Sequence, residues 1–328
     1  MTGPGFLWLD ANQMLAATAL LALAVDAVLG DPRWLYARLP HPVQLIGHAV
    51  AWCDRRLNRP DSRGNMARGA LAVLCLVGGL FAAAWLLSRW LQGLPGGWIV
   101  EALLASTLFA ARGLHDAVAA VAAALDRGLD EARAAVAHIV GRDPESLDEA
   151  GIGRAAVESL MENFSDGVAA PLFWFLLLGL PGLVAYKALN TCDSMLGHRS
   201  ERHLHFGRLA ARLDDAVNFI PARLAGGLLC LAAALLPRFD GRHAWRAMWR
   251  DAGRHRSPNA GWQEAAAAGA LGIAIAGPRR YAGTMVEDAW MGDGRSAVTA
   301  GDLRRALTLY LAANGLMALG LVGLLYWT

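Results

Sequence analysis

Residues 69–87 read GALAVLCLVGGLFAAAWLL, a continuous apolar run without one charged side chain. A helix needs about 20 apolar residues to cross the hydrocarbon core of a bilayer, so this run predicts a transmembrane helix. The whole chain agrees, because 55% of its 328 residues are hydrophobic, only 18% are charged and the mean hydropathy is +0.34. A soluble protein of this length would carry about a quarter charged residues. The sequence therefore predicts a membrane protein.

Outward from this run, other apolar segments predict further spans. They are residues 14–30, 98–114, 219–237 and 307–327, the last closed by the interfacial pair Tyr326-Trp327. Residues 168–189 are interrupted by the string GLPG at 179–182. Glycine beside proline ends or kinks a helix, so a kinked span and a re-entrant hairpin both fit this segment. The run 265–277 is short, which suits a buried or re-entrant helix.

This pattern predicts an all-α fold, a polytopic membrane helical bundle with broken or re-entrant helices. We treat residues 1–328 as a single integral-membrane domain, because no repeat or long linker divides them. Arginines are dense over residues 33–68 and sparse over 89–98, which puts the first loop and the polar helical segment 112–167 in the cytoplasm. No basic residue precedes the first apolar run, which favours a retained helix over a signal peptide. We expect a multi-pass protein of the cell inner membrane with a cytoplasmic active site.

Composition also disfavours several function classes. The formal net charge of +2, without a basic stripe, argues against nucleic acid as a partner. The four cysteines form no CxxC pair, so we interpret them as small hydrophobes rather than zinc ligands or disulfides. No GxxxxGK[ST] loop occurs, so a nucleotide bound here would not use a P-loop.

The first polar cluster is ESLMENFSDG, residues 158–167. Glu158, Glu162 and Asp166 recur at intervals of four, so on a helix they line one face. Carboxylates without an intervening base repel each other, and a divalent cation such as Mg²⁺ would relieve that repulsion. A solvated helix face leading into a span is the alternative.

The second cluster is YKALNTCDSMLGHR, residues 186–199, which contains the only lysine of the chain. Its polar stripe consists of Lys187, Asn190, Asp193 and Ser194. Ionisable groups near membrane depth are costly and usually face a cavity or a partner, so the stripe could hold phosphates and a metal. Alternatively, Lys187 extends to the membrane surface and Asp193 pairs with Arg199.

The third cluster is RLDDAVNFIPAR, residues 212–223. Asp214 and Asn218 are one helical turn apart, a frequent arrangement of metal ligands. Acidic residues at a helix N-terminus, where they favour the helix dipole, would give the same pattern.

The fourth cluster is HRSPNAGWQE, residues 255–264. Ser257-Pro258 is typical of an N-cap followed by proline at the first helical position. Such a helix start offers backbone N–H groups to an anion, and His255 and Arg256 add positive charge. A phosphate or carboxylate site is one interpretation, and a simple capped turn is the other.

Two N-terminal segments, GDPRW at 30–34 and HPVQLIG at 41–47, could begin helices but indicate no chemistry alone. Taken together and in this order, the segments resemble the cobalamin-biosynthesis CobD/CbiB family, the adenosylcobinamide-phosphate synthases. The other matching strings are ESLMENFSDGVAAPLFW, YKALNTCDSMLGHR, RLDDAVNFIPAR and SPNAGWQEAAAAGALG. The resemblance covers nearly the whole chain. It departs at Gln263, where a proline is expected, and at Gly277, where a double glycine is expected.

The resemblance implies an ATP-dependent ligase. Such enzymes join a carboxyl of adenosylcobyric acid to the amine of aminopropanol phosphate, or a related amino alcohol, and use ATP and Mg²⁺. The corrinoid is then a substrate, and the expected partners are these two substrates, the lipid bilayer and other membrane enzymes of the corrinoid pathway. An acyl phosphate would activate the carboxylate, with magnesium spreading the charge of the transferred phosphoryl group.

Residue chemistry suggests how the roles divide. The hypothesis gives catalytic roles to Glu162, Asp166 and Asp193. It gives nucleotide binding to Lys187, Asn190, Ser194 and Arg199. It gives metal binding to Glu158, Glu162, Asp166, Asp214 and Asn218. It gives substrate binding to His41, Ser257, Asn259 and Glu264.

Three other readings fit parts of the sequence. An intramembrane Mg²⁺-dependent prenyltransferase would use similar acidic motifs at helix ends, but would release pyrophosphate and need no ATP. A non-catalytic membrane sensor on the same scaffold would be expected to have lost carboxylates that this chain keeps. A transporter would suit the broken helices, but its charges would line a transmembrane path rather than gather at helix ends.

Overall fold

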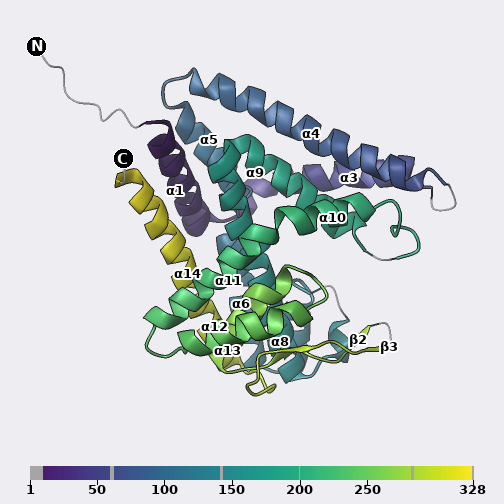
Figure 1. Ribbon diagram of the computed structural model, residues 1–328, viewed down its shortest axis with the longest axis vertical. Coiled ribbons are helices and arrows are strands. Elements are labelled where there is room, and N and C mark those ends of the chain that lie inside the picture. The colour runs from purple at the N-terminus through teal and green to yellow at the C-terminus, as the bar shows by residue number, and fades with distance from the viewer. Residues whose placement is uncertain (1–9, 60–62, 141–142, 199, 282–283, 327–328) are drawn as a thin grey trace, which may run out of the picture.

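The structure is a computed structural model that describes residues 10–59, 63–140, 143–198, 200–281 and 284–326. These residues are mostly helical (Figure 1). The helices are α1 Ala11–Leu29, α2 Arg33–Tyr36, α3 Pro42–Leu57, α4 Asn65–Gln92, α5 Gly97–Ser106, α6 Ala111–Leu125, α7 Leu129–Val136, α8 Glu149–Phe164, α9 Ala170–Leu196, α10 Arg208–Val217, α11 Phe219–Leu235, α12 Gly241–Asp251, α13 Ala260–Leu271 and α14 Ala300–Tyr326. Short helical turns are η1 Pro144–Ser146, η2 Ser165–Ala169 and η3 Ala252–Arg254. The strands β1 Ile275–Ala276, β2 Arg279–Tyr281, β3 Thr284–Val286 and β4 Trp290–Met291 pair antiparallel as β1–β4 and β2–β3.

The expected all-α membrane bundle is confirmed. Among the described residues, five helical stretches are long and apolar enough to cross a membrane: Ala11–Leu29, Asn65–Gln92, Gly97–Leu125, Glu149–Leu196 and Ala300–Tyr326. The pair α10 and α11, bent by 46°, would add a sixth. The apolar run 69–87 lies wholly inside α4, as predicted.

Breaks occur where glycine and proline predicted one, and also where they did not. Within α9 the backbone leaves helical geometry at Gly179, whose φ of 67° is open to glycine at no steric cost, and Pro181 follows. The segment 98–114 lies within the candidate span Gly97–Leu125, as predicted, but the helix is interrupted there, because α5 ends at Ser106 and α6 begins at Ala111. The run 265–277 is likewise only partly helical, since α13 ends before the left-handed Gly272 and the chain continues into β1.

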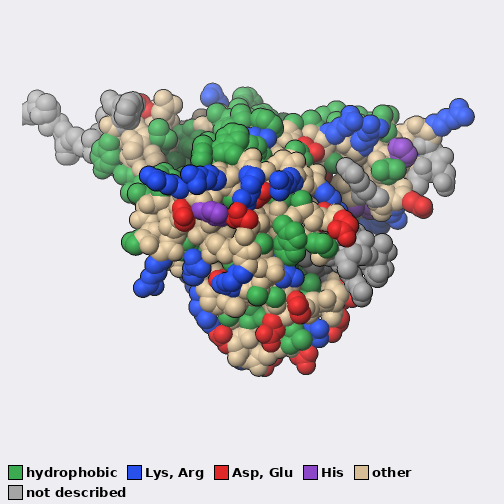
Figure 2. All heavy atoms as spheres, turned by 60° about the horizontal axis from the view of Figure 1, so that its bottom comes forward, with side chains coloured by type: hydrophobic (Ala, Val, Ile, Leu, Met, Phe, Trp, Pro, Cys, Tyr) green, Lys and Arg blue, Asp and Glu red, His purple; other side chains and the backbone are tan. Residues whose placement is uncertain are grey.

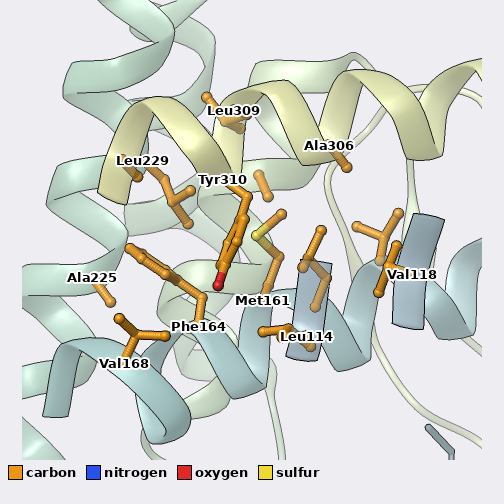
Figure 3. Packing of buried hydrophobic residues seen from close by; sticks show 14 of the residues in the cluster. Leu114, Val118, Met161, Phe164, Val168, Ala225, Leu229, Ala306, Leu309 and Tyr310 are labelled. Carbon is orange, nitrogen blue, oxygen red and sulfur yellow. The ribbon is translucent and has the colours of Figure 1, made fainter. Parts of the chain in front are cut away.

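The predicted polar segment 112–167 contains most of α6, then α7 and α8, and α8 is the centre of the packing. Helix α8 contacts α6, α7, α13 and α14. Figure 3 shows Phe164 of α8 against Tyr310 of α14, with ring centroids 5.6 Å apart and planes at 80°, and Met161 beside them. The face of the molecule in Figure 2 has hydrophobic side chains gathered at the top, a row of basic ones beneath, and a rounded polar part below.

Asp251, the last residue of α12, connects that helix to the β1–β4 ladder. Its carboxylate accepts hydrogen bonds from Arg250, at 2.9 and 2.7 Å, and from the backbone N–H of Gly292 at 2.9 Å. Burial raises the pKa of Asp251, but these hydrogen bonds outweigh burial, so its pKa lies below the usual range. The carboxylate is therefore charged at neutral pH, and its hydrogen bond to Gly292 links α12 to the end of the β1–β4 ladder.

A carboxylate inside the first span explains the unpredicted break between α5 and α6. Asp26 is 3% exposed, and its Oδ2 accepts the backbone N–H of Ala111 at 2.7 Å, the first residue of α6. The Tyr310 hydroxyl donates to the carbonyl of the same Ala111 at 2.9 Å. An anion at a helix N-terminus satisfies N–H groups that have no partner within the helix. Asp26 thus caps α6 from a different helix, and α1, α6 and α14 meet at one residue.

Replacing Asp26 by alanine is expected to lower the free energy of unfolding by about 1–3 kcal/mol, because the Ala111 N–H loses its acceptor inside the protein. Asp26→Asn keeps an acceptor oxygen and should lose less. Thermal unfolding in detergent measures both. Asp10→Ala is the control, because Asp10 is the exposed N-cap of α1 and accepts the backbone N–H of Gln13 at 2.8 Å. It should lower the free energy of unfolding less than Asp26→Ala does. Equal melting temperatures for wild type and Asp26→Ala would contradict this role.

Candidate active site

The acidic segment 158–167 lies where α8 runs into α9 through a π-helical turn, Ser165–Ala169. Single π-helical turns inside α-helices are frequent at functional sites because the extra residue re-aims neighbouring side chains. Glu162 is exposed and Asp166 is half-buried. Glu158 is buried and its Oε1 accepts the backbone N–H of Ala276 at 2.9 Å. Glu158 therefore points toward β1, whereas Glu162 and Asp166 lie close enough to each other to interact electrostatically.

Three segments that are distant in sequence bring their carboxylates together. Asp166 of η2 lies within electrostatic reach of Glu162 on α8, Asp193 on α9 and Asp214 on α10. Asp193 in turn interacts with Glu162 and with Asp215. These five residues, Glu162, Asp166, Asp193, Asp214 and Asp215, are called the acidic cluster from here on. Asp215 was not predicted, although it stands next to Asp214 in the same string.

Amide side chains hold one member of this cluster in place. Asp214 is 8% exposed, and it accepts hydrogen bonds from Asn218 at 2.9 Å and Asn190 at 3.4 Å. The Asn218 carbonyl oxygen accepts a bond from the Tyr186 hydroxyl at 2.9 Å. This chain of bonds fixes the orientation of the Asp214 carboxylate, and Tyr186, at its far end, was not predicted as a site residue.

Lys187 connects the acidic cluster to a cavity. It interacts with Asp166 and Asp214, and it also lines a cavity of about 610 Å³. Residues of the two N-terminal segments, Asp31 and His41 among them, also line this cavity. The only lysine of the chain thus stands between a group of anions and a space large enough for a small ligand.

His41 is held on both sides of its ring. Its Nδ1 accepts the backbone N–H of Val43 at 3.2 Å, which caps α3, and its Nε2 lies 3.1 Å from Asp31 Oδ1. Because Nδ1 accepts, the ring proton belongs on Nε2, facing Asp31. The Tyr36 ring lies 4.6 Å from the His41 ring and also lines the cavity. Asp31 and Tyr36 were not predicted as site residues, although Asp31 belongs to the quoted GDPRW string.

The fourth predicted cluster, in the turn before α13, contacts α10 beside the acidic cluster. The Ser257 hydroxyl accepts the backbone N–H groups of Asn259 and Ala260, both at 3.2 Å. The Asn259 amide donates to the carbonyl of Asp215 at 2.8 Å, which joins this turn to the acidic cluster. Glu264 is buried at 3% exposure, 3.8 Å from His255.

The remaining predicted residues are placed as follows. Ser194 is exposed, and its hydroxyl donates to the carbonyl of Asn190 at 2.9 Å, one turn back on α9. Arg199 lies outside the described residues. The site is thus assembled from α8, η2, α9, α10 and the turn before α13, and the N-terminal segments share with Lys187 the lining of the adjoining cavity.

The acidic cluster has the donor chemistry for magnesium delivered with a phosphate ligand. Its carboxylate oxygens are the hard ligands that Mg²⁺ prefers. Within the described part of the chain, no three His, Cys, Asp or Glu side chains converge as a ready-made metal site. Mg²⁺ usually binds through one or two carboxylates together with substrate phosphates and water, rather than in an all-protein cage. The acidic cluster therefore suits Mg²⁺ delivered with an anionic ligand better than a permanently bound ion, and Lys187 is the cation beside these carboxylates.

Proteins of one family are similar to this chain over most of its length. The family described as CobD/Cbib protein matches residues 19–310. A cobalamin biosynthesis protein CobD from a Sinorhizobium species is 48% identical over 308 residues, which cover 91% of this chain and 94% of that protein. The CobD proteins of Brucella anthropi and Rhodobacter capsulatus are 46% and 45% identical, over 93% and 95% of this chain and 97% and 98% of their own lengths. No solved structure matches the chain. The chain therefore belongs to the CobD/CbiB family of cobalamin biosynthesis proteins.

Proposed function

We propose that this protein is an ATP-dependent amide ligase that joins adenosylcobyric acid to aminopropanol phosphate, giving adenosylcobinamide phosphate. The observation that carries the proposal is the position of Lys187, between the acidic cluster and the 610 Å³ cavity that His41 also lines. A lysine beside grouped carboxylates suits a nucleotide whose phosphates need both a direct cation and a bound metal. The names of the relatives support the pathway, and the site supports the type of reaction.

Amide formation from a carboxylate needs a better acyl donor than the carboxylate itself. ATP supplies the phosphoryl group for an acyl phosphate, and Mg²⁺ supplies positive charge at the transferred group. A carboxylate oxygen of the corrinoid attacks the γ-phosphorus and ADP leaves. The amine then attacks the acyl carbon and inorganic phosphate leaves, while the amine gives up a proton.

The residues of the chain take the following parts in this scheme. Glu162, Asp166 and Asp193 bind the metal or accept the amine proton, because their carboxylates are close enough to interact electrostatically with one another. Lys187 contacts the nucleotide phosphates. Asn190 and Asn218 hold Asp214 in its orientation.

Substrate binding and sidedness complete the proposal. His41 contributes to the wall of the cavity that receives the small phosphorylated substrate. Ser257 and Asn259 shape the rim on the other side of the acidic cluster. ATP is a cytoplasmic metabolite, so we place the site on the cytoplasmic face of the inner membrane.

The proposal is tested with purified protein in detergent, incubated with adenosylcobyric acid, aminopropanol phosphate, ATP and Mg²⁺. A corrinoid product of the amide mass that forms only when ATP is present is expected, together with one ADP per product. The free amino alcohol is run in parallel to establish which amine is used. Folded protein that forms no amide with either amine, but releases pyrophosphate from an isoprenyl diphosphate, would replace the ligase proposal with the prenyltransferase reading.

A further inference from the structure

A second cavity, of about 440 Å³, lies between α1, α6 and α14. Its walls are apolar side chains and small residues, including Leu23 and Ala24 of α1 and Leu311 and Gly315 of α14. No atom lies within 4 Å of the position that a Cβ on Gly315 would occupy, so the cavity is open at this glycine. Volumes of this size, in the range of about 300–1,000 Å³, and apolar linings are typical of sites for small ligands. None of the residues assigned to the ligase reaction lines this cavity.

The cavity lies along two candidate membrane spans, α1 and α14. The two helices lie side by side and run in opposite directions (Figure 1). Gln13 of α1 donates to the carbonyl of Leu325 on α14 at 3.2 Å, and at the other end Asp26 and Tyr310 both bond to Ala111. At 1.5 Å per residue these two points are roughly 20 Å apart. Asp26 lies in the last turn of the candidate span Ala11–Leu29, so we place Ala111, which it contacts, near one boundary of a hydrocarbon core about 30 Å thick.

The polar residues of the lining gather at this boundary. Arg112 and His115, both on the first turns of α6, line the cavity together with Ala111. Asp116 orients both of them, because its carboxylate lies 2.7 Å from Arg112 Nε and 3.0 Å from His115 Nδ1. The Arg112 guanidinium also reaches the carbonyl of Ala27 at 3.4 Å, which holds it over the end of α1. An oriented guanidinium above an apolar cavity is complementary to a phosphate above a hydrocarbon chain.

We propose that this cavity binds one phospholipid, with an acyl chain between α1 and α14 and its phosphate on Arg112 and His115. The occupant is a membrane lipid because two candidate spans, α1 and α14, form most of the walls, and Arg112 lies beside the end of α1, where we place the boundary of the hydrocarbon core. The site does not depend on the proposed ligase reaction. The proposed lipid site does adjoin the candidate active site, because Ala110 lines the 610 Å³ cavity and the next residue, Ala111, lines the 440 Å³ cavity.

The test measures lipid binding to the delipidated full-length protein by native mass spectrometry. Palmitoyl-oleoyl phosphatidylglycerol is titrated against two controls, diacylglycerol with the same chains and glycerol 3-phosphate. We expect one phosphatidylglycerol per chain, bound at least about tenfold more tightly than either control, since a hydrogen bond to a charged group contributes about 1.5–3 kcal/mol. Gly315→Leu should fill the cavity and weaken binding at least about tenfold, as a leucine excludes the chain sterically.

Gly320→Leu is the matched variant, because it adds the same side chain to the same helix at another open position that does not line the cavity. It should change the affinity less than about twofold. If Gly315→Leu does not fold, Ala24→Leu fills the cavity from the opposite wall. Arg112→Gln should retain the lipid but reduce the preference for phosphatidylglycerol over diacylglycerol. Unchanged binding in both filling variants, equal loss in Gly320→Leu, or equally tight binding of glycerol 3-phosphate would overturn the proposal.

Discussion

Asp166→Asn is expected to reduce ATP-dependent amide formation by about 100- to 1,000-fold, the usual cost of removing one group that stabilises charge at a reacting centre. Asp166 interacts with three other carboxylates and with Lys187. Asparagine keeps the size of the side chain but removes the charge that would help to bind Mg²⁺. The measurement is the rate of corrinoid amide formation as a function of Mg²⁺ concentration.

The stability of the variant separates a catalytic from a structural role. Asp166→Asn removes one of several like charges that lie close together, so the melting temperature should not fall. A residue kept for function at some cost to stability shows this combination of lost activity and retained stability. Asp130→Asn is the control, because its side chain is 99% exposed on α7, and it should keep wild-type activity. Turnover of Asp166→Asn within about twofold of wild type would remove Asp166 from the proposed mechanism.

Lys187→Met is expected to lower kcat/KM for ATP by roughly 10- to 150-fold, which corresponds to losing a hydrogen bond of about 1.5–3 kcal/mol to a charged group. Methionine keeps the length of the side chain and removes its charge. Lys187→Arg should not restore full activity, because a planar guanidinium does not occupy the space of a compact ammonium. Steady-state kinetics with ATP varied at saturating corrinoid and amine measures the effect.

A second measurement on Lys187 does not depend on turnover. Because the chain has no other lysine, an amine-directed reagent can modify only Lys187 and the N-terminal amine. MgATP should protect Lys187 from the reagent and leave the N-terminal amine reactive, as followed by peptide mass. Arg127→Met, which removes an exposed cation paired with Glu131, should leave both the kinetics and the protection unchanged. Equal labelling of Lys187 with and without MgATP would exclude contact with the nucleotide.

The helical spans were predictable because a bilayer imposes one strong requirement on sequence, namely long apolar runs. Residues 69–87 lie inside α4 for this reason, and the break at Gly179 followed from glycine and proline alone. The break between α5 and α6 was not predictable. It depends on the contact of Asp26 with Ala111, which are 85 positions apart, and no local pattern encodes such a contact.

For the candidate site too, only relations between residues close in sequence were predictable. Helical spacing identified Glu158, Glu162 and Asp166 as neighbours, but the π-helical turn after Phe164 and the contact of Glu158 with Ala276 divide them. Spacing also could not show that Lys187 would face a cavity that His41 lines, because these residues meet only through the packing of α3 against α9.

The cap that Asp26 provides for α6 also has a consequence for biosynthesis. The first span leaves the ribosome with a carboxylate near its end, and the N–H that satisfies this carboxylate is synthesised 85 residues later. At about 5–20 residues per second, that delay is roughly 4–17 s. During this interval an unpaired carboxylate is costly in hydrocarbon, so the end of the first span is retained in hydrated surroundings until α6 arrives. The lateral release of the first helix into lipid is thereby coupled to the translation of the third candidate span.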